Sequence, residues 1–216
     1  MAKTRIAFVC TDCGAEHGQW QGQCSACKAW NTLSQINLGG SGSPAAKADF
    51  RQRGYAGEKS DVQTLEDIDL EALPRFSSSI GELDRVLGGG LVPGSVILVG
   101  GNPGAGKSTL LLQIMCILAD LEKVALYVTG EESLQQVGMR AQRLNLPKQA
   151  LKILAETNVE QICHAAQEHK PSLLVVDSIQ VIHSSEVPSA PGSVSQVREC
   201  AAYLIQYAKQ TNTVLF

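Results

Sequence analysis

A glycine-rich stretch from Gly101 to Ser108, with the sequence GNPGAGKS, has the residue types and spacing that bind the phosphates of a nucleotide. It matches the P-loop pattern G-x-x-x-x-G-K-[ST] in full. The glycines let the backbone fold around phosphate with its N–H groups pointing inward, and the dipole of the following helix adds to the attraction. Lys107 supplies a positive charge to the β- and γ-phosphates, the Ser108 hydroxyl is a ligand for Mg²⁺, and Thr109 lies near the α-phosphate. The predicted phosphate-binding residues are Gly101, Asn102, Pro103, Gly104, Ala105, Gly106, Lys107, Ser108 and Thr109.

Acidic residues follow two apolar runs of the sequence. Asp177 ends the run 173–176, and an acid at the tip of a buried strand beside the P-loop can hold Mg²⁺ through water. The alternative for Asp177 is a residue that caps the next helix. Glu131 and Glu132 follow the run 125–129, and Glu131 is the preferred candidate for polarising an attacking water because it lies nearer the strand tip. On the residues alone, both glutamates fit equally well as acids that favour a helix N-terminus.

Four cysteines near the N-terminus form two pairs, Cys10-x-x-Cys13 and Cys24-x-x-Cys27, separated by ten residues. Each pair predicts a tight turn that presents two thiolates, and two such turns complete a tetrahedral site for Zn²⁺. A segment this small has little core, so the metal is expected to supply most of its folding free energy. The alternatives are a dithiol redox pair, unpaired thiols or iron in a rubredoxin-like site. His17 could compete as a ligand, but four cysteines already fill the site, so we expect it on the surface.

The other cysteines and histidines have no ligand spacing. Three cysteines fall on the apolar faces of helix-like segments and are expected to be core thiols: Cys116, Cys163 and Cys200. Three histidines are expected to be structural or surface residues: His164, His169 and His183. Gly14 follows the first cysteine pair, where a positive φ is often needed. Trp20 and Trp30 are expected to pack over the metal site.

Short apolar runs alternate with amphipathic segments from about residue 61 onward. The apolar runs predict β-strands at 95–99, 123–128, 151–154, 172–176 and 213–216. The amphipathic segments predict α-helices at 80–87 (capped by Ser79), 107–119, 134–144, 159–169 and 195–209. This alternation indicates a parallel sheet covered on both faces, and such sheets bind ligands at the carboxyl ends of their strands, where Gly101 and Asp177 fall. The last run reaches Phe216 without a stop signal, so we expect a fragment whose further strands are missing.

Three regions of the chain differ in composition. We expect residues 1–30 to form the zinc ribbon, residues 31–60 to be a flexible linker, and residues 61–216 to form the truncated α/β domain. The net charge of −3 argues against a uniformly basic surface that coats nucleic acid, although it is compatible with a local basic patch. No apolar run approaches the roughly 18 residues of a membrane span, and no signal peptide is visible. Paired cysteines in an odd total fit metal binding in a reducing compartment, so we expect a cytoplasmic protein without membrane contact.

The ribbon and the P-loop together resemble the RadA (Sms) family of bacterial DNA repair proteins, which have RecA-like ATPase cores. The P-loop is preceded by IGELDRVLGGGLVPG at 80–94, and further motifs of the family match at 127–133 (YVTGEES), 177–180 (DSIQ) and 189–199 (SAPGSVSQVRE). The resemblance covers nearly the whole chain apart from the linker. The P-loop alone is shared by many nucleoside triphosphatases, whereas the combination of motifs is specific.

The resemblance implies an ATP hydrolase that uses ATP, Mg²⁺ and Zn²⁺ and works as a DNA-dependent, helicase-like motor of recombinational DNA repair. Such a motor promotes branch migration on recombination intermediates, binds single-stranded DNA and forms a homo-hexamer when full length, with RecA recombinase or a replicative helicase as candidate partners. By the same likeness, Glu131 corresponds to the glutamate that activates water. The segment 183–198 resembles the loop that faces single-stranded DNA, which makes Gln196 and Arg198 candidate DNA contacts. The alternative for Arg198 is a solvated position at the start of the next helix.

The sequence departs from the family in one respect. The family's later Lys-Asn-Arg-Phe-Gly motif and its domain similar to Lon protease are absent, so this chain alone is expected to bind nucleotide poorly and to hydrolyse it hardly at all. A nucleotide-regulated adaptor without motor activity is the alternative function, and a small-molecule kinase on the same P-loop scaffold is a third. DNA-stimulated ATP turnover separates the motor from the adaptor.

Overall fold

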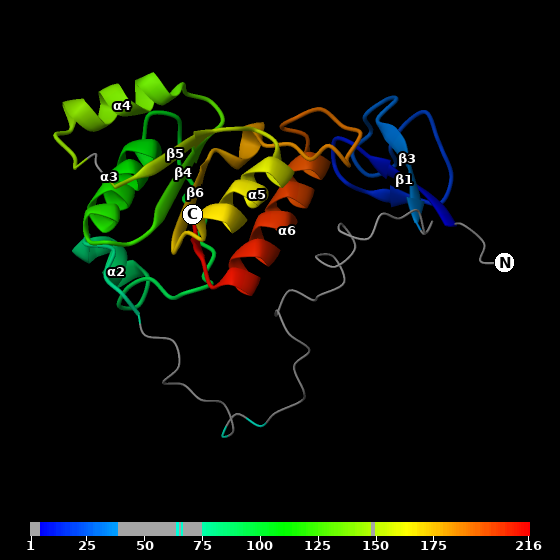
Figure 1. Cartoon of the computed structure of the whole chain (residues 1–216). Helices are drawn as coiled ribbons and strands as arrows, with labels where there is room; N and C mark the ends of the chain where they lie inside the picture. Colours follow the sequence, from blue (N-terminus) through cyan, green and yellow to red (C-terminus); the bar gives the residue numbers. More distant parts are fainter. Residues whose placement is uncertain (1–4, 39–63, 65, 67–74, 148–149) are drawn as a thin grey trace.

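The computed structural model describes residues 5–38, 64, 66, 75–147 and 150–216, which form a small antiparallel sheet and a larger α/β part (Figure 1). The greater part of the predicted linker lies outside these residues. None of the helices within the described ranges is both long and apolar enough to cross a lipid bilayer.

The N-terminal part is a three-stranded sheet in the order β2-β1-β3, built from β1 (Arg5–Cys10), β2 (Glu16–His17) and β3 (Leu33–Leu38). Its apolar core is small, with Cys10, Cys24 and Leu33 buried together. β3 lies within the range that the sequence predicted as linker, so the ribbon extends to residue 38 rather than ending at residue 30. The prediction failed because the antiparallel pairing with β1, from Cys10↔Leu33 to Arg5↔Leu38, is a long-range contact that local composition does not reveal.

The larger part is a parallel sheet in the order β5-β4-β6-β7. Its strands are β4 (Ala125–Thr129), β5 (Lys152–Ala155), β6 (Leu173–Asp177) and β7 (Val214–Leu215). All five residues of β4 are buried, as expected for a central strand that helices cover on both faces. The predicted parallel α/β architecture is therefore confirmed.

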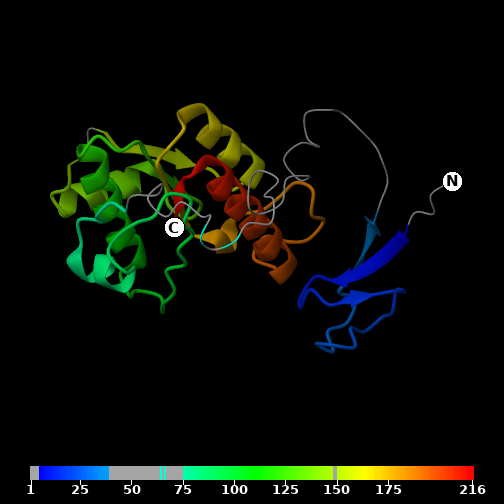
Figure 2. The same ribbon diagram turned by 90° about the horizontal axis from the view of Figure 1, so that it is seen from below.

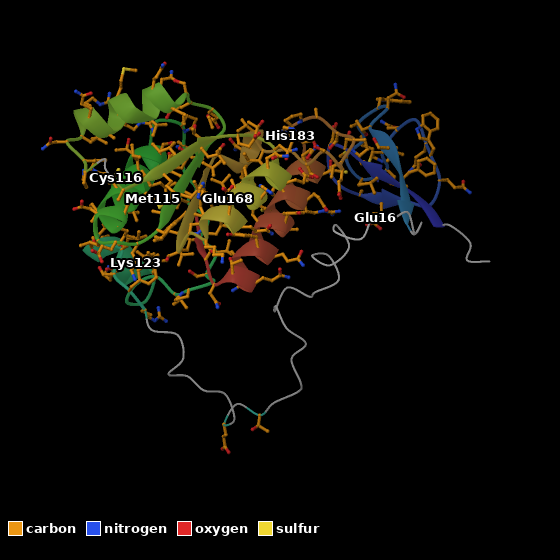
Figure 3. All side chains as sticks on the ribbon, in the orientation of Figure 1. Glu16, Met115, Cys116, Lys123, Glu168 and His183 are labelled. Atoms are coloured by element: carbon orange, nitrogen blue, oxygen red, sulfur yellow. The ribbon has the colours of Figure 1, made fainter. Side chains whose placement is uncertain are left out.

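Helices cover both faces of this sheet (Figures 1 and 2). They are α2 (Gly81–Val86), α3 (Lys107–Asp120), α4 (Leu134–Arg143), α5 (Val159–His169) and α6 (Val194–Thr211). Alternate residues of β4 face opposite sides: Tyr127 packs in one core with residues of α3 and α4, whereas Leu126 and Val128 pack in a second core with α5 and α6. Met115 of α3, labelled in Figure 3, belongs to the first core.

The segment that enters the P-loop forms less of a strand than the sequence predicted. Its backbone is joined to β7 by two hydrogen bonds, from Ile97 N to Leu215 O (2.8 Å) and from Leu215 N to Ser95 O (2.9 Å). A single parallel bridge, Val96↔Leu215, results, and Leu98 is 87% exposed. β7 therefore lies between this segment and β6, so the strand of Asp177 is one strand removed from the P-loop rather than directly beside it.

Most predicted helix bounds hold to within two residues, but the predicted cap of the first helix is wrong. Ser79 has φ of +65° and is not the cap; α2 follows Ile80, which makes no side-chain cap bond. Asp84 instead organises this turn, because its carboxylate accepts hydrogen bonds from Ser78 N (2.8 Å) and Ser77 Oγ (2.5 Å). The pKa of Asp84 is lowered first by the Ser77 hydroxyl, then by the Ser78 side chain, and least by the Ser78 N–H group.

Candidate nucleotide site and metal centre

The P-loop connects the extended segment 95–99 to α3. Gly104 (φ +80°) and Gly106 (φ +87°) adopt left-handed backbone conformations that glycine tolerates and other residues rarely do. Apart from the glycine and its two chain neighbours, no heavy atom lies within 4 Å of the position that a Cβ would take at either glycine, so space is open beside the loop. α3 begins at Lys107 directly after this turn, which directs its first N–H groups toward the loop. These features fit a triphosphate tail.

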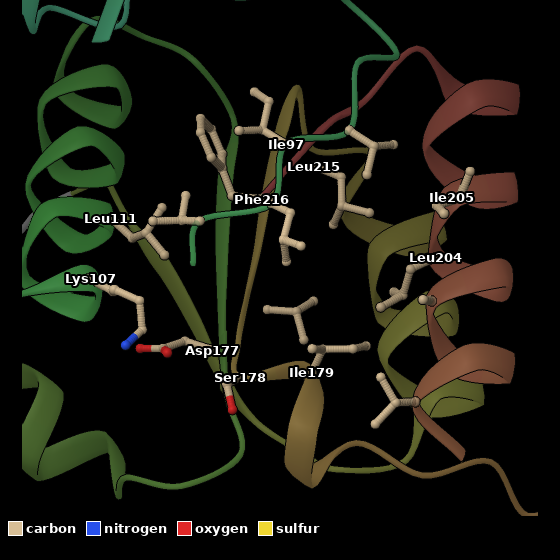
Figure 4. A pocket seen from close by; sticks show the side chains of 16 residues that line it. Ile97, Lys107, Leu111, Asp177, Ser178, Ile179, Leu204, Ile205, Leu215 and Phe216 are labelled. Carbon is tan, nitrogen blue, oxygen red and sulfur yellow. The ribbon is translucent and has the colours of Figure 1, made fainter. Parts of the chain in front are cut away.

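Lys107 begins α3 and lines one cavity together with Asp177 at the end of β6. Its Nζ donates to the carbonyls of Gly101 (2.8 Å) and Asn102 (3.1 Å), which hold the side chain across the loop. The amine and the carboxylate of Asp177 point toward each other at the edge of a cavity of 380 Å³ (Figure 4). The structure thus brings together two residues that the sequence predicted as one site. Ser108 and Thr109 occupy the first turn of α3.

Asp177 is held by a hydroxyl that the sequence analysis did not single out. Tyr127 Oη donates to Asp177 Oδ2 over 2.5 Å. Tyr127 is fully buried, and burial, followed by this hydrogen bond, raises the pKa of its hydroxyl well above the ordinary value. The hydroxyl therefore stays protonated and acts as a donor. The parallel register, in which Thr129 pairs with Asp177, places Tyr127 within reach of the carboxylate, and only this register could have identified it.

The two neighbouring glutamates after β4 have different surroundings. Glu131 Oε1 accepts a hydrogen bond from Ser178 Oγ over 2.6 Å, which joins the tips of β4 and β6. Glu132 pairs instead with Arg140 of α4, and its backbone N–H donates to Thr129 Oγ1 (3.0 Å). Of the two acids, Glu131 is therefore the one that lies beside the Asp177–Ser178 tip.

The segment 183–198 contains one residue whose predicted role the structure contradicts. Gln196 is 2% exposed, so its side chain is not available to DNA. Its Oε1 accepts from Ser184 N (2.8 Å), and its Nε2 donates to the carbonyls of Val187 (2.9 Å) and Ser189 (3.0 Å). Gln196 thus holds the preceding loop together from the first turn of α6. A glutamine in a polar stretch of sequence is expected to be exposed, and only the folded loop shows that it is buried.

Arg198, the second candidate DNA contact, lies on the exposed side of α6. Its Nη1 lies 3.6 Å from the position that a Cβ on Gly14 would take, so it borders the ribbon. Gly14 itself has φ of +72°, as predicted for the residue after the first cysteine pair.

The four ribbon cysteines converge on one point. The Sγ atoms of Cys10 and Cys27 lie 3.6 Å apart and those of Cys13 and Cys24 lie 3.5 Å apart, and all four sulfurs are within 4.8 Å of one another. Tetrahedral Zn²⁺ with bonds of about 2.3 Å requires sulfurs about 3.8 Å apart, so the cluster fits this ion.

Hydrogen bonds at this cluster favour the thiolate of Cys24. The backbone N–H of Cys27 and, more weakly, the ring of His17 outweigh the effect of burial and lower the pKa of Cys24 to about 5. His17 was expected to be a surface residue; it is partly buried, and its Nε2 lies 3.5 Å from Cys24 Sγ. The sequence showed only that His17 lies between the cysteine pairs; β2 turns it toward them.

Of the other predictions about single residues, one is wrong and one is confirmed. Both tryptophans are exposed, Trp20 by 58% and Trp30 by 69%, so the expectation that they pack over the metal site is wrong. The three cysteines outside the ribbon are buried, which confirms them as core thiols: Cys116, Cys163 and Cys200. His164 and His169 are exposed on α5, and His183 is partly buried.

Comparison with known proteins places two domain types along the chain. Residues 65–216 match the model of an AAA domain, and residues 8–35 match a rubredoxin metal binding domain. The chain is 62% identical over 211 residues to the DNA repair protein RadA of Haemophilus influenzae, an alignment that covers 97% of this chain and 45% of that protein. It is 60% identical to the DNA repair protein RadA of Escherichia coli, with 97% of this chain and 45% of that protein covered. The chain thus spans about half the length of these relatives.

Proposed function

The chain belongs to the AAA domain family, and we propose that it is the nucleotide-binding part of a DNA-dependent ATPase of recombinational DNA repair. The observation that carries this proposal is the meeting of three groups at the carboxyl end of one parallel sheet: the P-loop with Lys107, the carboxylate of Asp177 and the carboxylate of Glu131. Ligands of such sheets bind at this end. The name of the relatives, DNA repair protein RadA, supports repair as the process.

In this proposal each residue has one task. The loop amides and Lys107 bind the phosphates of ATP, and Ser108 and Asp177 would hold Mg²⁺, which would supply positive charge against the negative charge of the phosphates. Glu131 orients water for in-line attack on the γ-phosphate. Tyr127 keeps the carboxylate of Asp177 in position through its hydrogen bond, and Ser178 does the same for Glu131.

The DNA-related part of the proposal rests on the full-length relatives and on the exposed position of Arg198. We propose that the complete cytoplasmic protein is a hexameric branch-migration motor on single-stranded DNA, which works with RecA recombinase or a replicative helicase. Because a basic contact to phosphate releases counterions, its binding to DNA should weaken as salt concentration rises. Nucleotide binding without DNA-stimulated turnover would instead indicate the regulated adaptor.

The ribbon has a separate role in this proposal. We assign its four-cysteine centre to Zn²⁺, with Cys10, Cys13, Cys24 and Cys27 as ligands, because their sulfurs have the separations of a tetrahedral thiolate site.

Replacement of Lys107 tests the nucleotide site. In the full-length protein, Lys107→Ala is expected to weaken Mg-ATP binding by roughly 10- to 100-fold, because hydrogen bonds to charged groups contribute about 1.5–3 kcal/mol each. ATP turnover should disappear with it. Titration calorimetry measures the binding, and a phosphate-release assay with and without single-stranded DNA measures the turnover. Lys209→Ala, an exposed lysine on α6, is the matched control and should change neither value.

Unchanged binding and turnover in Lys107→Ala would refute the proposed nucleotide site. Retained binding in the wild type without any stimulation by DNA would refute the motor and leave the adaptor.

A further inference from the structure

The two buried cysteines of the metal centre each lie within hydrogen-bond distance of a polar side chain. Cys10 and Cys24 have no exposed surface, whereas Cys27 is exposed. His17 Nε2 lies 3.5 Å from Cys24 Sγ, and Thr32 Oγ1 lies 3.2 Å from Cys10 Sγ. Water cannot solvate a buried thiolate, and its negative charge needs protein donors instead. The two polar side chains therefore lie beside the two sulfur atoms whose negative charge solvent stabilises least.

The hydrogen-bond partner of the second ring nitrogen determines the tautomer of His17. Gln21 Nε2 lies 2.8 Å from His17 Nδ1. An amide nitrogen is only a donor, so Nδ1 must be the acceptor, and the proton of the neutral ring then resides on Nε2. The Nε2–H group consequently donates to Cys24 Sγ. Gln21, His17 and Cys24 form a directed chain of hydrogen bonds that ends on a metal ligand.

His17 is not itself a ligand in this arrangement. The ligand atoms that converge among the described residues are the four cysteine sulfurs, and the ring of His17 is outside that group. β2 positions the backbone of His17, which pairs with Phe8 of β1, and the ring itself contacts Gln21 and Cys24. Residues that hydrogen-bond to metal ligands orient them and adjust their basicity.

We propose that His17 is a positioning residue of the metal centre, whose Nε2–H bond to Cys24, directed by Gln21, slows the loss of the bound metal. The inference rests on the proposed assignment of this centre to Zn²⁺. Thr32 has the equivalent task at Cys10.

The rate of zinc transfer from the whole chain to a coloured chelator tests this role. His17→Leu removes the donor, and zinc affinity is expected to fall about tenfold with a corresponding rise in the transfer rate. His17→Gln can present an amide N–H near the former Nε2 and should restore most of the wild-type rate. Thr32→Val removes only the other donor and should also accelerate transfer. His164→Leu, an exposed histidine of α5, is the control and should leave the rate unchanged.

Spectra of the Co²⁺-substituted chain separate positioning from ligation. The charge-transfer bands of four thiolates should be the same in the wild type and in His17→Leu. A His17→Leu spectrum that indicates a different set of ligands would show that His17 binds the metal directly. An unchanged zinc transfer rate in His17→Leu would show that its hydrogen bond has no effect. Either result overturns the proposal.

Two further outcomes keep the test decisive. If His17→Leu does not fold, Gln21→Leu replaces it. Gln21 is exposed, and its loss removes only the hydrogen bond that fixes the proton of His17 on Nε2. Zinc transfer at the wild-type rate in Gln21→Leu overturns the proposal. A wild-type chain that binds no zinc refutes the assignment of the metal itself. This result differs from zinc binding whose transfer rate does not change when His17 is replaced, which refutes only the role of His17.

Discussion

Three hydrogen-bonded pairs position the acidic residues that follow β4 and end β6. Tyr127 holds Asp177 and Ser178 holds Glu131, so both carboxylates are fixed beside the tips of β4 and β6. Glu132 is drawn away by Arg140 of α4. Two glutamates that are adjacent in the chain therefore have different surroundings: Glu131 lies beside Ser178, whereas Glu132 lies beside Arg140 of α4.

This division predicts different effects for the two amide substitutions. In the full-length protein, Glu131→Gln is expected to lower ATP turnover by roughly 10²- to 10⁴-fold, the usual contribution of a positioned general base. Nucleotide binding should remain, since Glu131 lies beside Ser178 rather than in the loop. Steady-state phosphate release and titration calorimetry provide the two measurements.

Glu132→Gln is the matched control for that substitution. It should leave turnover within a few-fold of the wild type while it weakens the pair with Arg140. If Glu132→Gln abolished turnover and Glu131→Gln did not, the roles assigned here would be reversed.

At the scale of elements, the turn that leaves β4 is packed against the segment after β6. Gly130 donates its N–H to the carbonyl of Asp177 (3.0 Å), and a Cβ at this position would lie only 2.4 Å from Val181 Cγ2. The absence of a side chain at Gly130 thus lets the tips of β4 and β6 approach each other. This approach is what places Glu131 within reach of Ser178.

Gly130→Ala is therefore expected to destabilise the α/β part by about 1–3 kcal/mol, the usual cost of overpacking. Thermal or urea unfolding followed by circular dichroism measures the change. Gly138→Ala is the control, because Gly138 lies within α4 and a Cβ there meets nothing within 4 Å. The free energy of unfolding of that variant should rise by about 0.5–1 kcal/mol because alanine has a higher helix propensity than glycine. Equal stability of Gly130→Ala and the wild type would contradict the packing argument.

At the scale of the whole molecule, the two parts have different sources of stability. The ribbon buries few apolar side chains, chiefly Val9, Cys10, Cys24 and Leu33. The α/β part has two extensive apolar cores, one on each face of its sheet. The ribbon should therefore depend on its metal, whereas the α/β part should not.

Removal of metal by a strong chelator is expected to unfold the ribbon and leave the α/β part folded. The chain offers two independent signals, because both of its tryptophans, Trp20 and Trp30, lie in the ribbon, whereas all of its described α-helices lie in the α/β part. Tryptophan fluorescence should change on chelation and recover when Zn²⁺ is added, while the helical circular dichroism stays constant. Loss of both signals together would show that the parts fold as one unit, and loss of neither would refute the structural role of the metal.

The sequence alone determined the features that depend on contiguous residues or on repeated local patterns. The P-loop, the two cysteine pairs and the alternation of strands and helices are of this kind, and α5 was predicted at the bounds that it has, residues 159–169. Tertiary structure decided which side chains meet across the chain. Tyr127 reaches Asp177 over 50 positions and Glu131 reaches Ser178 over 47, contacts that exist only because parallel pairing aligns the ends of β4 and β6. The burial of Gln196, the ribbon strand β3 and the contact between His17 and Cys24 have the same origin: long-range packing, rather than local propensity, sets their surroundings.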